Sequence, residues 1–119
     1  MTSRGEGASA RAPIEDGWFA DVNGEAQWVT AHGVDRAAPP LLILTGPGAA
    51  FSRLTPFFAP WEAAFTLVQW DQPGAGATFA RNGETPLSLD RLVADAEVVA
   101  ETALARLGAP RLIVLGISG

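Results

Sequence analysis

The last four residues of the chain, Gly116-Ile117-Ser118-Gly119, place a possible nucleophile directly after the apolar run at 112–115. A serine held on a sharp turn between a strand and a helix has a strained backbone, so its neighbours must be very small. Gly116 and Gly119 meet this need, and with Ser118 they match G-x-S-x-G except for its final glycine. The tetrapeptide alone is equally compatible with an ordinary loop after a strand, so the rest of the sequence has to decide.

Two glycine-rich segments earlier in the chain also follow apolar runs. Thr45-Gly46-Pro47-Gly48 follows Leu41-Leu42-Ile43-Leu44, and Asp71-Gln72-Pro73-Gly74-Ala75-Gly76-Ala77-Thr78 follows the run at 65–70. Uninterrupted apolar runs of this length are typical of strands buried on both faces, which need helices on either side. We therefore predict buried strands over 41–44 and 112–115, and a further strand over 65–70.

Helices are expected between these strands. From Ser88 to Leu107 apolar residues recur at spacings of three and four, and Gly108 provides a stop, which predicts a long helix. Thr55 has the chemistry of an N-cap, and Pro60 limits the helix that would follow to a turn or two. Four acidic residues on the long helix form no paired site and are expected on its solvated face: Asp90, Asp95, Glu97 and Glu101.

The first third of the chain predicts a tail and a hairpin. Residues 1–13 show no hydrophobic period and are expected to form a disordered tail. Asn23-Gly24, between two aromatic and apolar runs, predicts an antiparallel hairpin. Strands alternating with helices after it imply a parallel sheet. The expected fold class is α/β, with an entry hairpin, a mostly parallel sheet and crossover helices forming one domain over 14–119.

The order of the glycine-rich segments, with the long helix before the last of them, resembles the α/β-hydrolase superfamily. Within it the chain is most similar to the proline iminopeptidase-like branch, whose members carry H-G-G-P-G in the first loop and D-Q-x-G-x-G-x-S/T in the second. The resemblance covers residues 17–119, and Trp70-Asp71-Gln72-Pro73-Gly74 is its more specific part. It implies the N-terminal half of an α/β-hydrolase fold, ending at the nucleophile elbow.

The resemblance also implies site residues. Ser118 would be the nucleophile, the amide of Gly119 one oxyanion donor, and an amide near Gly46 the second; such donors commonly lower a barrier by about 3 kcal/mol each. The implied activity is that of a serine hydrolase, an aminopeptidase releasing N-terminal residues, often proline, through an acyl-enzyme. The sequence departs from the branch at Leu44-Thr45, where the branch has His-Gly. Because a β-branched threonine restricts the backbone more than glycine does, the departure bears on the loop geometry and on the role of Gly46.

Asp71 and His32 precede the serine, whereas the acid and the histidine follow it in this superfamily. We expect Asp71 to stabilise a turn by accepting amide hydrogen bonds, and His32 to be a surface or half-buried residue. The acid and base that a serine nucleophile requires would lie beyond Gly119. The chain by itself is therefore expected to be an inactive fragment of a longer enzyme.

Composition excludes several other classes of function. The chain contains no cysteine and one histidine, which excludes thiolate catalysis and cysteine-ligated zinc, and we expect no metal or other cofactor. A net charge of −5, with the arginines scattered, argues against a nucleic acid or an anionic membrane as partner. No apolar run approaches the roughly 18 residues of a membrane span, so a cytoplasmic protein is expected. The resemblance implies that its substrate is a small peptide or ester.

Two alternatives remain open. An esterase-type hydrolase is possible because one fold supports many reactions, although serine rather than aspartate at position 118 disfavours the epoxide and haloalkane branches. A non-catalytic α/β module could instead bind a partner through the strand at 112–115, which would lie at an open edge of the sheet. The departure at Leu44-Thr45 favours the second alternative, and the intact Gly116-Ile117-Ser118-Gly119 favours a hydrolase.

Overall fold

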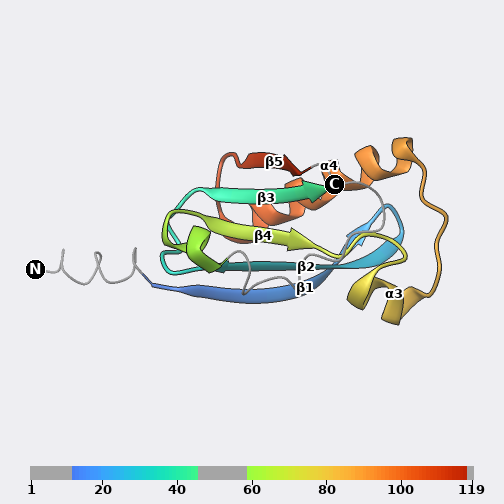
Figure 1. Cartoon of the computed structure of the whole chain (residues 1–119), viewed down its shortest axis with the longest axis horizontal. Coiled ribbons are helices and arrows are strands. Elements are labelled where there is room, and N and C mark those ends of the chain that lie inside the picture. Colours follow the sequence, from blue (N-terminus) through green and yellow to red (C-terminus); the bar gives the residue numbers. More distant parts are fainter. Residues whose placement is uncertain (1–11, 46–58, 118–119) are drawn as a thin grey trace, which may run out of the picture.

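The computed structural model describes residues 12–45 and 59–117. In these ranges the chain forms one five-stranded sheet with the order β1-β2-β4-β3-β5, as Figure 1 shows. All three residues that we expect to act in catalysis, Gly46, Ser118 and Gly119, lie outside the described residues, as do residues 1–11 of the predicted tail.

The predicted hairpin is confirmed. β1 (Ile14–Val22) pairs antiparallel with β2 (Glu25–Gly33) along its whole length. The turn between them places Asn23 at φ 51° and Gly24 at φ 90°, the left-handed conformations that this dipeptide adopts most readily. One face of the hairpin then contributes apolar side chains to the larger core cluster: Ile14, Trp18, Ala20, Val22, Val29 and Ala31.

The parallel part of the sheet consists of β3 (Pro40–Thr45), β4 (Thr66–Trp70) and β5 (Ile113–Ile117). β3 pairs in parallel with both of the others, while β4 also pairs antiparallel with β2 and so joins the hairpin to the parallel strands. All five residues of β4 are buried, as are Leu41, Leu42 and Ile43 in β3. The predicted buried strand over 41–44 and the predicted strand over 65–70 are confirmed.

The strand predicted over 112–115 exists, but it is not buried on both faces in the part of the chain that the structure describes. β5 lies at the edge of the sheet, and Ile113 and Val114 are 48% and 54% exposed. An apolar run indicates that a strand can be buried. Whether it is buried depends on the strands and helices that pack around it in the folded sheet. The expectation of an open edge at this strand is confirmed for the described residues.

The long helix is α4 (Leu89–Leu107), which packs against β1 and β3 and lies behind the sheet in Figure 1. Its ends are those predicted: Ser88 Oγ accepts a hydrogen bond from the Arg91 amide at 3.1 Å, and Gly108 ends the helix at φ 66°. One prediction for this helix is wrong. Asp95 does not lie on the solvated face, because its exposed fraction is only 1% and its carboxylate is covered by the hairpin.

Two short helices complete the described structure. A 3-10 helix, η2 (Ala59–Ala63), contains Pro60, and the expected helix start at Thr55 lies outside the described residues. Helix α3 (Gly76–Asn82) was not predicted from the sequence. Its N-cap, Ala75, has no side chain that could accept a hydrogen bond, so the usual local signal for a helix start is missing.

Candidate active site

The carboxyl ends of β3 and β5 leave the sheet at the same level. Thr45 is the partner of Ile117 in the parallel pairing of these two strands. Neighbouring strands lie roughly 4.8 Å apart, so β3 and β5 end side by side at Thr45 and Ile117. This edge of the sheet, which we call the carboxyl edge, is defined by the ends of β3, β4 and β5 at Thr45, Trp70 and Ile117. Figure 1 shows the arrowheads of all three strands pointing toward it.

The segment after β4, residues 71–78, is held at the carboxyl edge by its own hydrogen bonds. Asp71 is fully buried, and its Oδ2 accepts a hydrogen bond from the Ala77 amide at 2.8 Å, at the start of α3. The carbonyl of Asp71 accepts a hydrogen bond from Thr78 Oγ1 at 2.6 Å. The expected structural role of Asp71 is therefore confirmed, because its carboxylate fixes the turn rather than pointing at an open space.

Residue Trp28 on β2 also forms hydrogen bonds to the segment 71–78. Thr78 is buried, and its Oγ1 accepts a hydrogen bond from the Trp28 amide at 2.8 Å, while the Trp28 carbonyl accepts one from the Asp71 amide at 2.9 Å. Position 78 therefore needs a hydroxyl that can donate and accept at once. The D-Q-x-G-x-G-x-S/T pattern contains that requirement in its last position.

Two buried polar residues near this edge were not found by sequence reasoning. Gln27 is fully buried, and Asp95 is held by hydrogen bonds from Gln27 and from its helix neighbour Arg91. A signal for Asp95 existed: it lies between Leu92 and Val99 at the helical spacing of the buried face. Gln27, by contrast, gave no signal, because one polar residue within a strand predicts exposure as readily as burial.

His32 lies away from the candidate site. On β2 it pairs with Leu67, near the start of β4, so the length of β4 separates it from the carboxyl edge. Its Nδ1 lies 4.0 Å from Glu15 Oε2, and its side chain is 18% exposed. The expectation of a half-buried histidine is confirmed, and this position gives it no access to a reaction at the ends of the strands.

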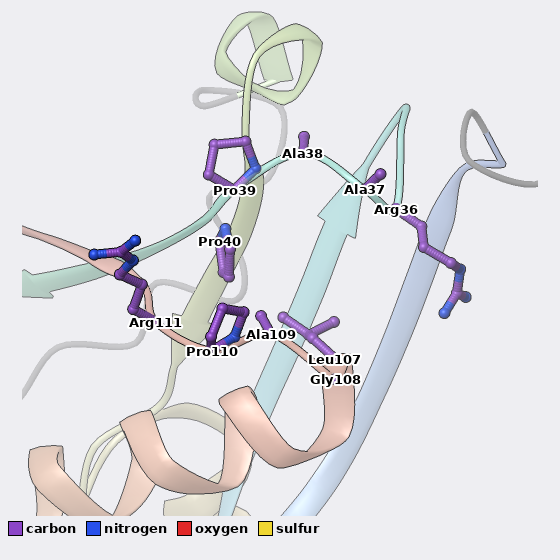
Figure 2. A pocket seen from close by; sticks show the side chains of 10 residues that line it. All are labelled: Arg36, Ala37, Ala38, Pro39, Pro40, Leu107, Gly108, Ala109, Pro110 and Arg111. Atoms are coloured by element: carbon purple, nitrogen blue, oxygen red, sulfur yellow. The ribbon is translucent and has the colours of Figure 1, made fainter. Parts of the chain in front are cut away.

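A hollow of about 360 Å³ lies at the opposite, amino edge of the parallel strands. Figure 2 shows that it is formed by the segment 36–40 before β3 and by the segment 107–111 between α4 and β5. In open α/β sheets substrates bind at the carboxyl ends of the strands, so this hollow is on the wrong side for the expected reaction. Among the described residues, no group of three or more His, Asp or Glu side chains could hold a metal ion.

Among the described residues, Asp16 near the start of β1 has a shifted pKa. Arg106, near the end of α4, donates hydrogen bonds from Nε and Nη2 to the two carboxylate oxygens of Asp16, at 3.0 and 3.3 Å. These bonds, helped by the positive charge of Arg106, hold the pKa of Asp16 below its ordinary value of 3.8 against the opposing effect of burial. The Arg106 guanidinium also lies over the ring of Trp18, 4.6 Å from its centre.

No protein-family model matches this sequence, and the search of curated proteins found no match either. Among solved structures, the chain is similar to a proline iminopeptidase-related protein from Thermus thermophilus. The two share 28% sequence identity over 87% of this chain and 36% of the other, with a TM-score of 0.66. It is also similar to 2-hydroxy-6-oxo-6-phenylhexa-2,4-dienoate hydrolase from a Rhodococcus species (22% identity, 91% and 38% of the two chains, TM-score 0.60). A third similar structure is naproxen esterase from Bacillus subtilis (19% identity, 98% and 39% of the two chains, TM-score 0.58).

The sheet order, the parallel ends of β3, β4 and β5 and these similarities show that the chain belongs to the α/β-hydrolase superfamily. Its hairpin and mixed five-stranded sheet are the amino-terminal part of that fold. The chain spans 36% to 39% of the length of the three solved structures. None of the described helices is long and apolar enough to cross a membrane.

Proposed function

We propose that the chain is the amino-terminal part of a serine hydrolase whose nucleophile is Ser118. The observation that carries this proposal is the pairing of Thr45 with Ile117 on parallel neighbouring strands. It brings the ends of β3 and β5, the residues just before Gly46 and Ser118 in the sequence, next to each other. A nucleophile on one of them and an amide donor on the other can then act on the same carbonyl group.

In the proposed reaction Ser118 Oγ attacks the carbonyl carbon of the substrate, and its proton passes to a general base. The amides of Gly119 and of a residue near Gly46 stabilise the negative charge that develops on the carbonyl oxygen. The leaving amine takes a proton and departs, which leaves an acyl-enzyme that water then hydrolyses. His32 lies at the other end of β4, so we do not assign it as the base. The order serine, acid, histidine in the superfamily places both partners after Ser118 in the proposed enzyme.

The proposed substrate is a peptide with a free amino terminus, from which one residue, often proline, is released. Two observations support this choice over an ester: the Asp71-Gln72-Pro73-Gly74 segment, and the 28% identity to a proline iminopeptidase-related protein. The similarity to naproxen esterase, at 19% identity, concerns the fold alone. Asp71 is buried and its Oδ2 accepts a hydrogen bond from the Ala77 amide, so we do not assign it the recognition of the substrate's ammonium group.

Fluorophosphonate labelling of a protein extended through the natural downstream sequence tests this proposal, with its Ser118→Ala variant beside it. We expect the extended protein to be labelled and the variant to remain unlabelled. Hydrolysis of a prolyl amide with a free amino terminus, compared with the same amide after N-acetylation, then tests the substrate class. A folded extended protein that is not labelled contradicts catalysis at Ser118 and favours the binding module, whereas hydrolysis of simple esters alone favours the esterase.

A further inference from the structure

We infer that a buried hydrogen-bond network centred on Asp95 positions the segment 71–78 at the carboxyl edge. Its consequence for catalysis rests on the proposed function, whereas its effect on the segment does not. The network joins the hairpin, β4, α4 and the connection between the two α-helices. We call it the Asp95 network, and its members are Asn23, Glu25, Gln27, Trp70, Thr85, Arg91 and Asp95.

Asp95 is the centre of the network. Its side chain is 1% exposed, and its carboxylate accepts three hydrogen bonds from three different elements. Asn23 Nδ2, in the hairpin turn, donates to Oδ1 at 2.8 Å, and Gln27 Nε2, on β2, donates to Oδ2 at 2.9 Å. Arg91 Nε, one helical turn earlier, donates to Oδ2 at 3.1 Å and supplies the compensating charge. A carboxylate buried in this way is costly unless its acceptors are used, and here they are.

Gln27 links Asp95 to β4 by hydrogen bonds. Its Nε2 donates to Asp95 and also to Glu25 Oε1 at 3.1 Å, while its Oε1 accepts a hydrogen bond from Trp70 Nε1 at 2.8 Å. Because carboxylates accept and the indole donates, only one orientation of the Gln27 amide satisfies all its partners. The indole of Trp70, which is 2% exposed, is therefore fixed in direction as well as buried.

Trp70 is the last residue of β4, and the segment 71–78 begins directly after it. The neighbour of Gln27 on β2, Trp28, holds the same segment through backbone bonds to the Asp71 amide and to Thr78 Oγ1. A second link runs from Glu25 Oε2, which accepts a hydrogen bond from Thr85 Oγ1 at 2.7 Å, to the connection after α3. The start of the segment and the chain beyond its end are thus both tied to β2.

Stability alone does not account for this arrangement. Buried charged networks can often be replaced by apolar residues of similar size with little loss of stability, because desolvating the charges offsets their attraction. Hydrogen bonds differ from apolar contacts in that they specify direction. A network that ends on Trp70, at the edge where Ser118 is proposed to act, has the properties of a positioning device.

The test uses apolar replacement, which separates position from stability. The variants are Trp70→Phe alone and Gln27→Met, Trp70→Phe and Asp95→Leu together, and Asp90→Asn on the exposed face of α4 is the matched control. Amide hydrogen exchange of the 119-residue chain reports on Asp71 and Ala77. Labelling of the extended protein by a fluorophosphonate reports on the reaction, and thermal unfolding reports on stability.

We expect both network variants to exchange the Asp71 and Ala77 amides faster, by about 10-fold or more in the triple variant, while the control leaves them unchanged. The rate constant for labelling is expected to fall about 10-fold in the triple variant even where its melting temperature is kept, since small displacements of a reacting group cost large factors in rate. If the triple variant does not fold, the same exchange and labelling measurements are made on Trp70→Phe, which removes only the hydrogen bond from Trp70 Nε1 to Gln27.

The possible outcomes separate this inference from the proposed function. Unchanged exchange at Asp71 and Ala77 in both variants, or exchange in the unmodified chain that is already unprotected, overturns the positioning role. Faster exchange with unchanged labelling overturns its relevance to catalysis. An extended protein that is never labelled contradicts the proposed function, and the exchange data then still decide whether the Asp95 network holds the segment.

Discussion

The two ends of the parallel strands are built differently. At the carboxyl edge the chain is held by directional bonds between buried polar groups, among them Asp71 to Ala77, Thr78 to Trp28 and Gln27 to Trp70. At the amino edge the hollow in Figure 2 is lined mainly by alanine and proline, and the side chain of Arg36 points away from the prolines. The nearby ion pair between Asp16 and Arg106 is partly exposed to solvent.

This difference shows which edge depends on exact geometry. Apolar contacts tolerate small shifts, whereas a buried hydrogen bond loses most of its value when its partner moves. The carboxyl edge is also where the proposed reaction takes place. We therefore expect substitutions at the carboxyl edge to have large effects and substitutions of similar size at the amino edge to have small ones.

The largest expected effect is that of Asp95→Ala. It leaves the Gln27 amide without its main acceptor inside the core, and Arg91 loses its nearer partner. We expect the free energy of unfolding to fall by about 3 kcal/mol, measured by urea unfolding followed by circular dichroism. Asp90→Ala, on the exposed face of the same helix, is the control and is expected to change stability by less than about 0.5 kcal/mol. Equal effects of the two would contradict the comparison.

Thr78→Val sharpens the comparison by keeping the shape of a buried side chain and removing only its hydroxyl. The Asp71 carbonyl then loses a donor and the Trp28 amide loses an acceptor, both in a buried place. We expect a loss of about 2 kcal/mol in the same unfolding experiment. Thr102→Val on α4 is the matched control, because the hydroxyl of Thr102 bonds only within its own helix, to the Val99 carbonyl, and we expect almost no change there.

Asp16→Asn tests the ion pair of the amino half. Because the pKa of Asp16 is lowered in the folded chain, its contribution is present above the ordinary value of 3.8 and is lost as the pH falls through the lowered value. We expect the unmodified chain to be more stable than the variant by at most about 1 kcal/mol at pH 7, since both side chains are partly exposed. The difference should close below pH 3.8, and in an Arg106→Leu background it should be smaller at pH 7, because only the Gly17 amide and the charge of Arg36 then favour the ionised carboxylate.

The smallest effect is expected for Ala37→Met, which adds an exposed apolar side chain beside the hollow at the amino edge. Stability should change by no more than about 0.5 kcal/mol, and fluorophosphonate labelling of the extended protein should not change at all. A clear loss of labelling would show that a substitution at the amino edge affects the reaction at the carboxyl edge, and would contradict the comparison.

Sequence reasoning succeeded where a feature depends on a few neighbouring residues. Asn23-Gly24 gave the hairpin because these two residues reach positive φ angles at low cost, and Ser88 with Gly108 gave both ends of α4. The apolar runs predicted β3 and β4 because side chains that are poorly soluble in water favour a buried position in a sheet. Helix α3 was not predicted because its N-cap residue carries no capping side chain. The carboxylate that bonds to the Ala77 amide belongs to Asp71, which precedes the N-cap.

Apart from helix α3, the sequence by itself determined the local elements of the described residues, their order and the resemblance that points to Ser118. Only the tertiary structure decided that Asp95 is buried and that Thr45 and Ile117 end at the same level. The physical reason is the separation in sequence of the residues that interact. Turns, caps and periodicity are set by residues a few positions apart, whereas Gln27 and Asp95 meet across 68 positions only after the hairpin and α4 have packed.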